Sequence, residues 1–453
     1  MKKILLIQLP TPQLFSDTDY FPLGLLYLHS YLVSHGAAVS FLDLSGRTDD
    51  VENWAIPEAD IYGITCTVVH DSLLRRLSFV LKERYPEALV IAGGAHAITL
   101  PSHLLRTTAV DAVCTGEGER MLLSLAQGNS LPFIEGLVWK DRSGNPRCNA
   151  SVPVIGDIDT LPLPSYRILD TNRYGCVISY GNMALRGGTV ITSRGCPFHC
   201  SFCASPAITR RKFRLNSVAY IMEMVDMLSG DLGYEGILFV DDILTINEDR
   251  LSLLCKEMKK RSLPWSALGR VDCMNEKVLT MMKDSGCVQL TVGIESASVG
   301  MLNKMRKGIT PKQQADAMLL AHKVGLPVKA CFIVGFPGET DATIAETEEF
   351  IRKYVVALGF YGTLNTFVPL PGSDVFNNPS AYGISIDAEK AFDSYFIAGA
   401  AGIGGYFHRE NEGDVRKWVD LLRGALQGQL TYYRMQYRTQ LPGASPVPQG
   451  DRR

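Results

Sequence analysis

The sequence lacks a long apolar segment, an excess of charge of either sign, and any cysteine after Cys331. Its first apolar run starts at Ile4 and stops at Gln8 and Pro10, which is too short for a signal peptide or a membrane span. Lys plus Arg number 45 against 47 Asp plus Glu, so no basic field attracts nucleic acid or an anionic membrane. We therefore expect no nucleic-acid partner and no membrane span.

The 11 cysteines are scattered along the chain except for one tight cluster. Without a secretion signal they argue against a disulfide framework and for reduced thiols, some of them ligands, in the cytoplasm. Because none follows Cys331, the C-terminal region cannot supply a second cysteine-ligated cluster. A chain of 453 residues, 46% hydrophobic and 20% charged, can bury large cores and suits two domains.

The first part of the chain alternates short apolar runs with helical patterns, which predicts a parallel sheet covered on both faces. The predicted strands are residues 3–9, 38–44, 60–66, 89–93 and 109–115, and the predicted helices are residues 23–35, 71–84 and 119–126. Five such strands make a doubly wound, flavodoxin-like sheet whose ligand crevice lies at the carboxyl ends of the strands. We assign this domain to residues 1–127 and a linker, with a hairpin turn at residues 141–146, to residues 128–187.

The alternation restarts at a longer spacing over residues 188–372. The predicted strands are residues 189–193, 236–240, 265–268, 288–293, 328–334 and 363–368. Six βα units indicate a partial, TIM-like (β/α)6 barrel, whose chemistry lies on the loops after the strands. Residues 373–453 form a small, mainly helical C-terminal region with a helix over about 414–438. Its many aromatic residues either cover a substrate pocket or are ordinary packing material.

The tight cysteine cluster consists of Cys196, Cys200 and Cys203, spaced C-x3-C-x2-C on the loop after the first barrel strand. Three thiolates this close can bind three irons of a cubane cluster and leave the fourth iron open. S-adenosylmethionine (SAM) could chelate that iron through its amine and carboxylate. The alternatives are a zinc site and three unrelated core cysteines. Structural zinc usually takes four protein ligands, and His199 lies between two of the thiols at an unusual spacing.

This segment resembles the radical SAM superfamily, and the resemblance runs over most of the chain. It implies that Phe202 lies near the adenine of SAM and that a glycine-rich segment after the fifth strand lies against the adenine. Carboxylates can hold ribose hydroxyls or an amino group, and glycine permits close backbone approach. The implied SAM residues are Phe202, Asp241, Asp242, Glu295, Ser296, Gly335, Phe336, Pro337 and Gly338. Taken singly, the acidic pair could be an exposed strand end and the glycine segment an ordinary turn.

Two arginines are candidates for the carboxylate of SAM, since a guanidinium binds a carboxylate in a bidentate fork. Arg270 is the better candidate because it ends a predicted strand, and Arg194 is the other. Either could equally close a surface ion pair.

Glycine loops follow the fourth and fifth strands of the first domain, where backbone can approach a large flat ligand. Placed before a cysteine-bearing barrel, they resemble the cobalamin-binding domain of cobalamin-dependent radical SAM enzymes. The residues this places near the corrin are Gln8, Thr65, Thr67, Gly93, Gly94, His96, Gly116 and Glu117.

No histidine lies in the loop after the first strand, and the D-x-H-x-x-G pattern is absent. We therefore expect cobalt without a histidine ligand from that loop, and His96 as a hydrogen-bonded loop residue. A domain that has kept its fold and lost its ligand is the alternative.

The resemblance implies an enzyme in which a [4Fe–4S] cluster cleaves SAM and the 5′-deoxyadenosyl radical abstracts hydrogen from a substrate carbon. Methyl transfer from methylcobalamin would follow, which makes the chain a C-methyltransferase. A cyclase or rearrangement enzyme similar to the anaerobic porphyrin cyclases is one alternative, and a non-catalytic carrier or sensor is another. The expected partners are a small-molecule substrate, flat or apolar in character, and an electron donor such as flavodoxin or ferredoxin.

Overall fold

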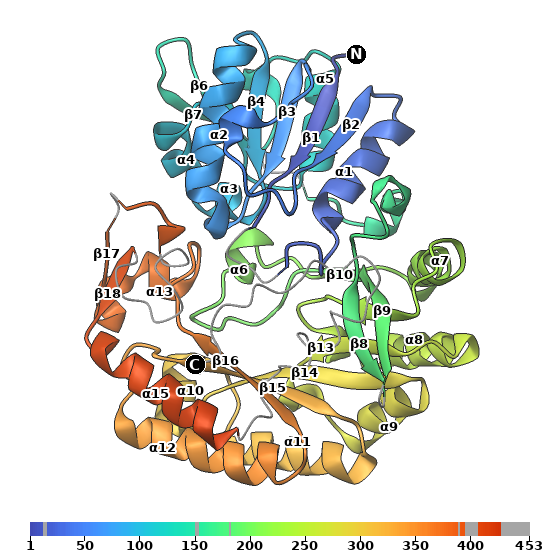
Figure 1. Cartoon of the computed structure of the whole chain (residues 1–453), viewed down its shortest axis with the longest axis vertical. Coiled ribbons are helices and arrows are strands. Elements are labelled where there is room, and N and C mark those ends of the chain that lie inside the picture. The colour runs from blue at the N-terminus through green and yellow to red at the C-terminus, as the bar shows by residue number, and fades with distance from the viewer. Residues whose placement is uncertain (12–15, 150–153, 181–182, 388–389, 395–405, 427–453) are drawn as a thin grey trace.

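The computed structural model consists of two stacked lobes, each built on its own seven-stranded sheet (Figure 1). The structure describes every residue except 12–15, 150–153, 181–182, 388–389, 395–405 and 427–453. We call the part built on β1 to β7 the first lobe and the part built on β8 to β16 the second lobe. In the described part of the chain, no helix is both long and apolar enough to cross a membrane.

The first sheet has the order β2-β1-β3-β4-β5-β6-β7, and its first five strands pair in parallel. Helices α1 and α5 pack on one face, whereas α2, α3 and α4 pack on the other. The strands are β1 (Ile4–Gln8), β2 (Val39–Asp43), β3 (Ile61–Thr65), β4 (Leu89–Gly93) and β5 (Ala112–Cys114). The helices are α1 (Leu23–Ser34), α2 (Asp71–Arg84), α3 (Ala95–Thr99), α4 (Pro101–Thr107) and α5 (Gly118–Ala126).

The first sheet continues past residue 127, into the segment that we expected as a linker. Strands β6 (Leu137–Lys140) and β7 (Pro146–Cys148) add to it as an antiparallel hairpin. The turn between them is built around Asp141, whose carboxylate accepts hydrogen bonds from the backbone N–H groups of Ser143 and Asn145. Because Leu137 and Val138 are buried, this hairpin is part of the first lobe.

The second sheet is a curled half-barrel with the order β16-β15-β14-β13-β12-β9-β8. Its strands pair in parallel, except that β8 is antiparallel to β9. The first barrel strand begins earlier than residue 189 because it forms a hairpin with β8. The strands are β8 (Cys176–Tyr180), β9 (Met183–Val190), β12 (Gly236–Phe239), β13 (Trp265–Gly269), β14 (Cys287–Glu295), β15 (Val328–Val334) and β16 (Tyr361–Thr366).

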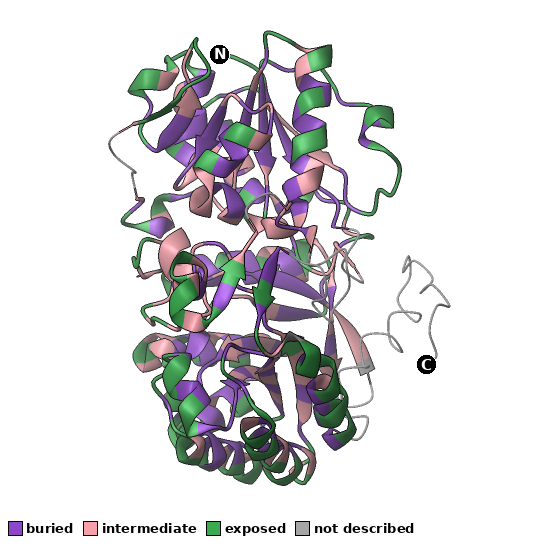
Figure 2. Cartoon of the chain, turned by 90° about the vertical axis from the view of Figure 1, so that its left-hand side faces the viewer, coloured by how far each residue is buried: buried purple, intermediate pink, exposed green. Residues whose placement is uncertain are grey.

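Helices on the convex side of the half-barrel bury one face in its core and expose the other (Figure 2). They are α7 (Val218–Asp226), α8 (Glu248–Arg261), α9 (Glu276–Asp284), α10 (Val299–Lys304), α11 (Pro311–Val324) and α12 (Asp341–Phe350). Helices α7 and α12 continue as the π-helical turns Met227–Asp231 and Ile351–Val356. Local sequence sets these bounds: α11 starts with a Thr310–Gln313 capping box and ends at Gly325 in the left-handed region.

Short elements connect the lobes and close the chain. The ladder of β10 (Ser193–Arg194) with β11 (Arg214–Leu215) and the helix α6 (Ser205–Ile208) flank the cysteine loop. The C-terminal region has α13 (Asp374–Asn377), β17 (Ile384–Ile386), β18 (Phe407–Arg409) and α15 (Glu412–Ala425). The predicted helix over 414–438 matches α15 in part, and its remainder lies outside the described residues. The predicted fold class, a doubly wound sheet followed by a partial barrel, is confirmed.

The aromatic residues of the described C-terminal region mainly pack on one another. Tyr406, Phe407 and Phe392 are buried in a cluster with Phe336 and Phe367. Of the other aromatic residues in this region, Tyr382 packs against the same cluster and Trp418 is buried in the barrel core. Five more lie outside the described residues: Tyr395, Phe396, Tyr432, Tyr433 and Tyr437. The described members therefore act as packing material.

Candidate functional site

A cavity of about 630 Å³ lies between the carboxyl edge of the first sheet and the cysteine loop of the second lobe. The two lobes meet there because the carboxyl ends of both parallel sheets face the same interface. From the first lobe, the predicted residues that line it are Thr65, Gly93, Gly94, Gly116 and Glu117. From the second lobe they are Cys203 and Asp242, together with the candidate Arg194.

The three cysteines of the loop after β9 and β10 are half-buried. The backbone N–H of Ser205 lies 3.4 Å from Cys203 Sγ. Burial raises the pKa of the Cys203 thiol to about 11, so the free thiol stays protonated near neutral pH and needs a metal to ionise. Ser201 anchors the loop, since its N–H donates to the carbonyl of Met305 over 2.8 Å.

The spacing of the three sulfurs bears on the zinc alternative. A zinc ion about 2.3 Å from each thiolate would hold the sulfurs within about 4 Å of one another. Among the described residues, Asp71, His96 and His103 form the one group of three such ligands whose atoms all lie within 4.8 Å. At least two of the three cysteine sulfurs are therefore more than 4.8 Å apart in this structure, farther than one zinc ion would hold them.

Arg270 lies against the cysteine loop. Its guanidinium carbon is 3.7 Å from the centre of the Phe198 ring, and Nη1 is 3.8 Å from Cys200 Sγ. Nε and Nη2 are held by Asp272 at 2.9 and 3.0 Å. A fixed positive charge therefore lies next to Cys200.

The two adjacent aspartates have different surroundings. Asp241 is fully buried, and its Oδ1 accepts hydrogen bonds from Thr192 N, Thr192 Oγ1 and Ser193 Oγ. Its Oδ2 has no hydrogen-bond partner in the described part of the chain, and burial raises the pKa of this carboxyl. Asp242 faces the cavity and accepts from Ser205 Oγ at 2.6 Å. Asp241 thus braces the segment before the cysteines, and Asp242 is open to a ligand.

The end of β14 carries a buried ion pair. Glu295 adopts a φ of 65°, which is rare for a residue other than glycine and marks a constrained site. Its carboxylate accepts from Lys307 Nζ at 2.7 Å, and both side chains are buried. Ser296 lies behind it, within 3.3 Å of Thr347 Oγ1. Sequence reasoning missed Lys307, because it follows the helix α10 and not a predicted strand.

The glycine-rich segment after β15 makes a tight turn. Gly335 and Gly338 have φ of 82° and 83°. Phe336 is fully buried in the aromatic cluster, and Pro337 separates it from Gly338. Glu339 Oε2 accepts from the N–H of Gly335, and burial raises the pKa of this carboxyl to about 7. The turn therefore presents mainly backbone, with its side chains directed into the protein.

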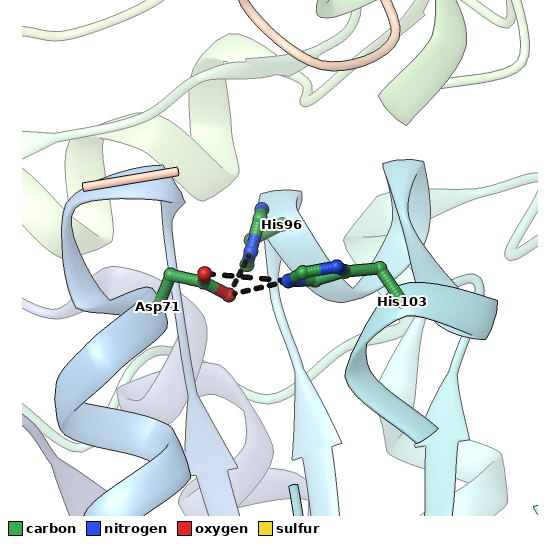
Figure 3. A group of neighbouring side chains, drawn as sticks. All are labelled: Asp71, His96 and His103. Atoms are coloured by element: carbon green, nitrogen blue, oxygen red, sulfur yellow. Dashed lines mark hydrogen bonds and ion pairs between the residues drawn. The ribbon is translucent and has the colours of Figure 1, made fainter. Parts of the chain in front are cut away.

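His96 is in a buried cluster with two other residues and does not line the cavity (Figure 3). The Nε2 atoms of His96 and His103 lie 2.9 and 3.1 Å from Asp71 Oδ1, and Asp71 Oδ2 accepts from the N–H of Phe392 at 3.0 Å. Hydrogen bonds from the two histidines help to hold the pKa of Asp71 well below its usual range, although burial opposes them. The three ligand atoms are close enough for one metal ion, but in this structure they form a hydrogen-bonded cluster.

The same C-terminal segment caps helix α2. Asp393 accepts hydrogen bonds from both Ser72 Oγ, at 2.8 Å, and Ser72 N, at 3.2 Å.

Two more residues that we predicted near the corrin, Gln8 and Thr67, do not line the cavity. Gln8 Nε2 donates to the carbonyl of Leu9, and Thr67 is exposed.

A network of ion pairs crosses the interface between the lobes at the edge of the cavity. The sequence did not predict these pairs. Arg194 pairs with Glu117 and Glu119 at 2.7 and 2.8 Å, and Arg214 pairs with Glu117 at 2.8 Å. Arg194 is therefore engaged with carboxylates of the first lobe.

Two family models match the chain in the regions that form this site. Residues 190–351 match the radical SAM superfamily, and residues 16–126 match the B12 binding domain. These matches define the class: a radical SAM enzyme with a B12-binding domain in front.

Relatives among known proteins extend over both lobes. The chain is 34% identical over 387 residues to an uncharacterized methyltransferase of Pyrococcus horikoshii, and the match covers 82% of each chain. It is 26% identical to the cytidylyl-2-hydroxyethylphosphonate methyltransferase of Streptomyces wedmorensis, with 86% of this chain and 83% of the relative covered. It is also 28% identical to the anaerobic magnesium-protoporphyrin IX monomethyl ester cyclase of Rubrivivax gelatinosus, over 78% of this chain and 65% of that one.

Among solved structures, the radical SAM methyltransferase TsrM from Kitasatospora setae shares the fold, with a TM-score of 0.66 and 18% identity. The alignment covers 89% of this chain and 80% of that one. The chain belongs to the family of cobalamin-dependent radical SAM methyltransferases. The predicted resemblance and the predicted cofactors, a [4Fe–4S] cluster, SAM and cobalamin, are confirmed at the level of the two domains.

Proposed function

We propose that Cys196, Cys200 and Cys203 hold the [4Fe–4S] cluster and leave one iron for the amine and carboxylate of SAM. The proposal is supported by the wide spacing of the three half-buried sulfurs and by the fixed charge of Arg270 beside Cys200. Arg270 is already held by Asp272, so we assign it to the cluster environment rather than to the carboxylate of SAM.

We further propose that Phe202, Asp242, Glu295 and Lys307 surround SAM on the concave side of the half-barrel. The Lys307 ammonium lies 5.9 Å from the Phe202 ring centre and uses one donor on Glu295, so it has donors left for a carboxylate or a hydroxyl. The turn at residues 335–338 offers backbone to the adenine, and Asp241 and Ser296 act behind these groups by bracing their backbone.

For the corrinoid, we propose the glycine edge of the first lobe, at Thr65, Gly93, Gly94, Gly116 and Glu117. The cavity reaches from this edge to Cys203 and Asp242, so one ligand over the sheet would lie next to the cysteine loop. Gln8, Thr67 and His96 are outside that lining, and we assign His96 to packing within its buried cluster. No histidine of the loop 9–24 is available to cobalt.

When bound, these cofactors supply the electron for reductive cleavage of SAM, the 5′-deoxyadenosyl radical and a transferable methyl group. The chain's own residues bind and orient them and exclude water at the lobe interface. We propose transfer of a methyl group to a carbon of a small-molecule substrate. An electron donor such as flavodoxin or ferredoxin and a reducing compartment, the cytoplasm, fit a chain in which Cys196, Cys200 and Cys203 are free thiols.

The test is anaerobic incubation of the reconstituted protein with SAM and dithionite. We expect 5′-deoxyadenosine from the wild type and from Cys148→Ala, whose thiol is exposed in the first lobe. Cys200→Ala should lose the cluster absorbance and all 5′-deoxyadenosine. If the wild-type protein forms no 5′-deoxyadenosine, the non-catalytic carrier or sensor is the hypothesis that stays. If Cys200→Ala still cleaves SAM, the three cysteines are wrongly assigned as cluster ligands.

A second candidate, a cyclase or rearrangement reaction, is favoured by the 28% identity to the Rubrivivax cyclase. The two reactions differ in the fate of the SAM methyl group. Deuterated methyl on SAM would appear in the product of a methyltransferase and would be absent from the product of a cyclase.

A further inference from the structure

The two proposed cofactor sites lie on different lobes, and a small set of charged residues joins the lobes beside the cavity. Arg194 is the last residue of β10 and stands two positions before Cys196. Its Nη1 donates to Glu117 Oε1 at 2.7 Å and its Nη2 to Glu119 Oε1 at 2.8 Å. Both glutamates stand at the start of α5, so this one guanidinium spans the interface.

Arg214 reinforces the same contact. It is the cross-strand partner of Arg194 in the β10–β11 ladder, and its Nη1 lies 2.8 and 3.0 Å from the two carboxylate oxygens of Glu117. The same Nη1 donates to the carbonyl of Ile155 at 2.6 Å, while the N–H of Ile155 donates to Glu117 Oε2 at 2.6 Å. Two cations therefore balance two anions, with several hydrogen bonds that fix their orientation.

This network is partly desolvated. The side chain of Arg194 is 20% exposed, Glu119 is 4% exposed and Arg214 is 11% exposed. Charge pairs removed from water are weakly screened by salt, and loss of one partner leaves the other charge without compensation. The network is thus able to hold two lobes in one arrangement, which an exposed surface pair is not.

The connection from Arg194 to the cysteines is short and closely packed. Gly195 has a φ of 103°, and a Cβ placed there would meet the carbonyl oxygen of Lys212 at 2.1 Å. On the other side, Ser193 and Thr192 are tied to the buried Asp241. With both flanks packed, residues 192–196 form one unit of the second lobe, and the Arg194 guanidinium ties this unit to the first lobe.

We propose that Arg194 is a positioning residue that fixes the separation between the cluster on the cysteine loop and the corrinoid on the first lobe. The proposal rests on the proposed function, because it takes the two cofactor sites from there. Its physical basis is that Glu117 and Gly116 line the corrinoid cavity, while Arg194 leads directly into the cluster loop. One ion-pair network thereby connects the walls of both sites.

The experiment measures the magnetic coupling between the reduced cluster and cob(II)alamin by pulsed EPR, in the full-length protein loaded with both cofactors. The variants are Arg194→Met and Arg194→Lys. The control is Arg261→Met, because Arg261 makes a similar two-point pair with Asp226, at 2.6 and 2.7 Å, and its side chain is 23% exposed. That pair joins α8 to α7 within the second lobe.

We expect the wild type and Arg261→Met to give one narrow distribution of cluster-to-cobalt distances. Arg194→Met should broaden it at least about twofold and weaken corrinoid binding about tenfold, since a preorganised charged contact is lost. Arg194→Lys should give an intermediate width, because a single ammonium cannot hold two carboxylates in the fork of a guanidinium. Iron content and the cluster EPR signal report whether the second lobe is intact.

A distance distribution of wild-type width in Arg194→Met, with both cofactors bound, would overturn the proposal. Should Arg194→Met fail to fold, Glu119→Gln removes one arm of the network and must broaden the distribution in the same way, or the proposal is equally overturned. A wild type that binds no corrinoid or forms no 5′-deoxyadenosine would instead remove the proposed function, and the positioning role with it.

Discussion

Replacing Glu339 with glutamine should change how the stability of the second lobe depends on pH. The Glu339 side chain is buried in the turn after β15, and burial raises the pKa of its carboxyl to about 7 in the folded chain. In the unfolded chain the pKa returns to its usual 4.5. Between these two values the folded state holds a proton that the unfolded state has released, so stability falls as pH rises.

The size of the effect follows from the two pKa values. At about 1.36 kcal/mol for each pKa unit, the shift corresponds to about 3 kcal/mol. This contribution is fully present below pH 4.5 and is lost as pH rises through 7. Glu339→Gln cannot ionise, and its amide oxygen can still accept from the Gly335 N–H. The variant should therefore gain about 3 kcal/mol relative to the wild type between pH 4.5 and pH 8.

The assay is urea unfolding of cluster-free protein at several pH values, with wild type and variant side by side so that other titrating groups cancel. Glu346→Gln serves as the control, because Glu346 is an exposed residue on the adjacent helix α12. Parallel stability curves for the wild type and Glu339→Gln across this range would refute the assignment of a buried, protonated carboxyl.

Three further substitutions test the site. Gly195→Ala should lose most of its cluster, measured as iron content after reconstitution, because its Cβ would lie 2.1 Å from the carbonyl oxygen of Lys212; full iron content would contradict this. Asp71→Asn should lower the free energy of unfolding by about 3 kcal/mol in urea titration, since it replaces a carboxylate oxygen that accepts hydrogen bonds in a buried cluster; an unchanged midpoint would argue against that cluster. Gly94→Ala should cost about 2 kcal/mol and weaken corrinoid binding in an absorbance titration, because φ is 93° and the Cβ would meet the carbonyl oxygen of Cys66 at 2.7 Å; wild-type affinity and stability would show that the loop relaxes.

Elements that bury a regular apolar pattern were predictable from the sequence. Strand β4 and helix α2 have the bounds that their periodicity predicts, since hydrophobic spacing acts locally. The π-helical ends of α7 and α12 and the early start of β9 were not predictable, because they depend on packing and on pairing with β8.

The residues of the candidate site also fall into two groups: those that the sequence predicts and those that only the structure reveals. Cys196, Cys200 and Cys203 could be picked out because three cysteines within eight positions carry their own signal. The difference between Asp241 and Asp242 could not, because adjacent residues on one motif are distinguished only by which one faces the cavity. Lys307 and the Glu117–Arg194 pair also needed the structure, since their partners are distant in sequence.

The cap on helix α2 has a consequence for biosynthesis. The N–H group of Ser72 and the carboxylate of Asp71 bind Asp393 and Phe392, which lie 321 positions later in the chain. The ribosome synthesises the first lobe before residues 392 and 393, so the start of α2 is exposed to water until the C-terminal segment has been made. Completion of that helix is therefore a late event, and protection of the Ser72 amide from hydrogen exchange would report that synthesis has reached the C-terminal segment.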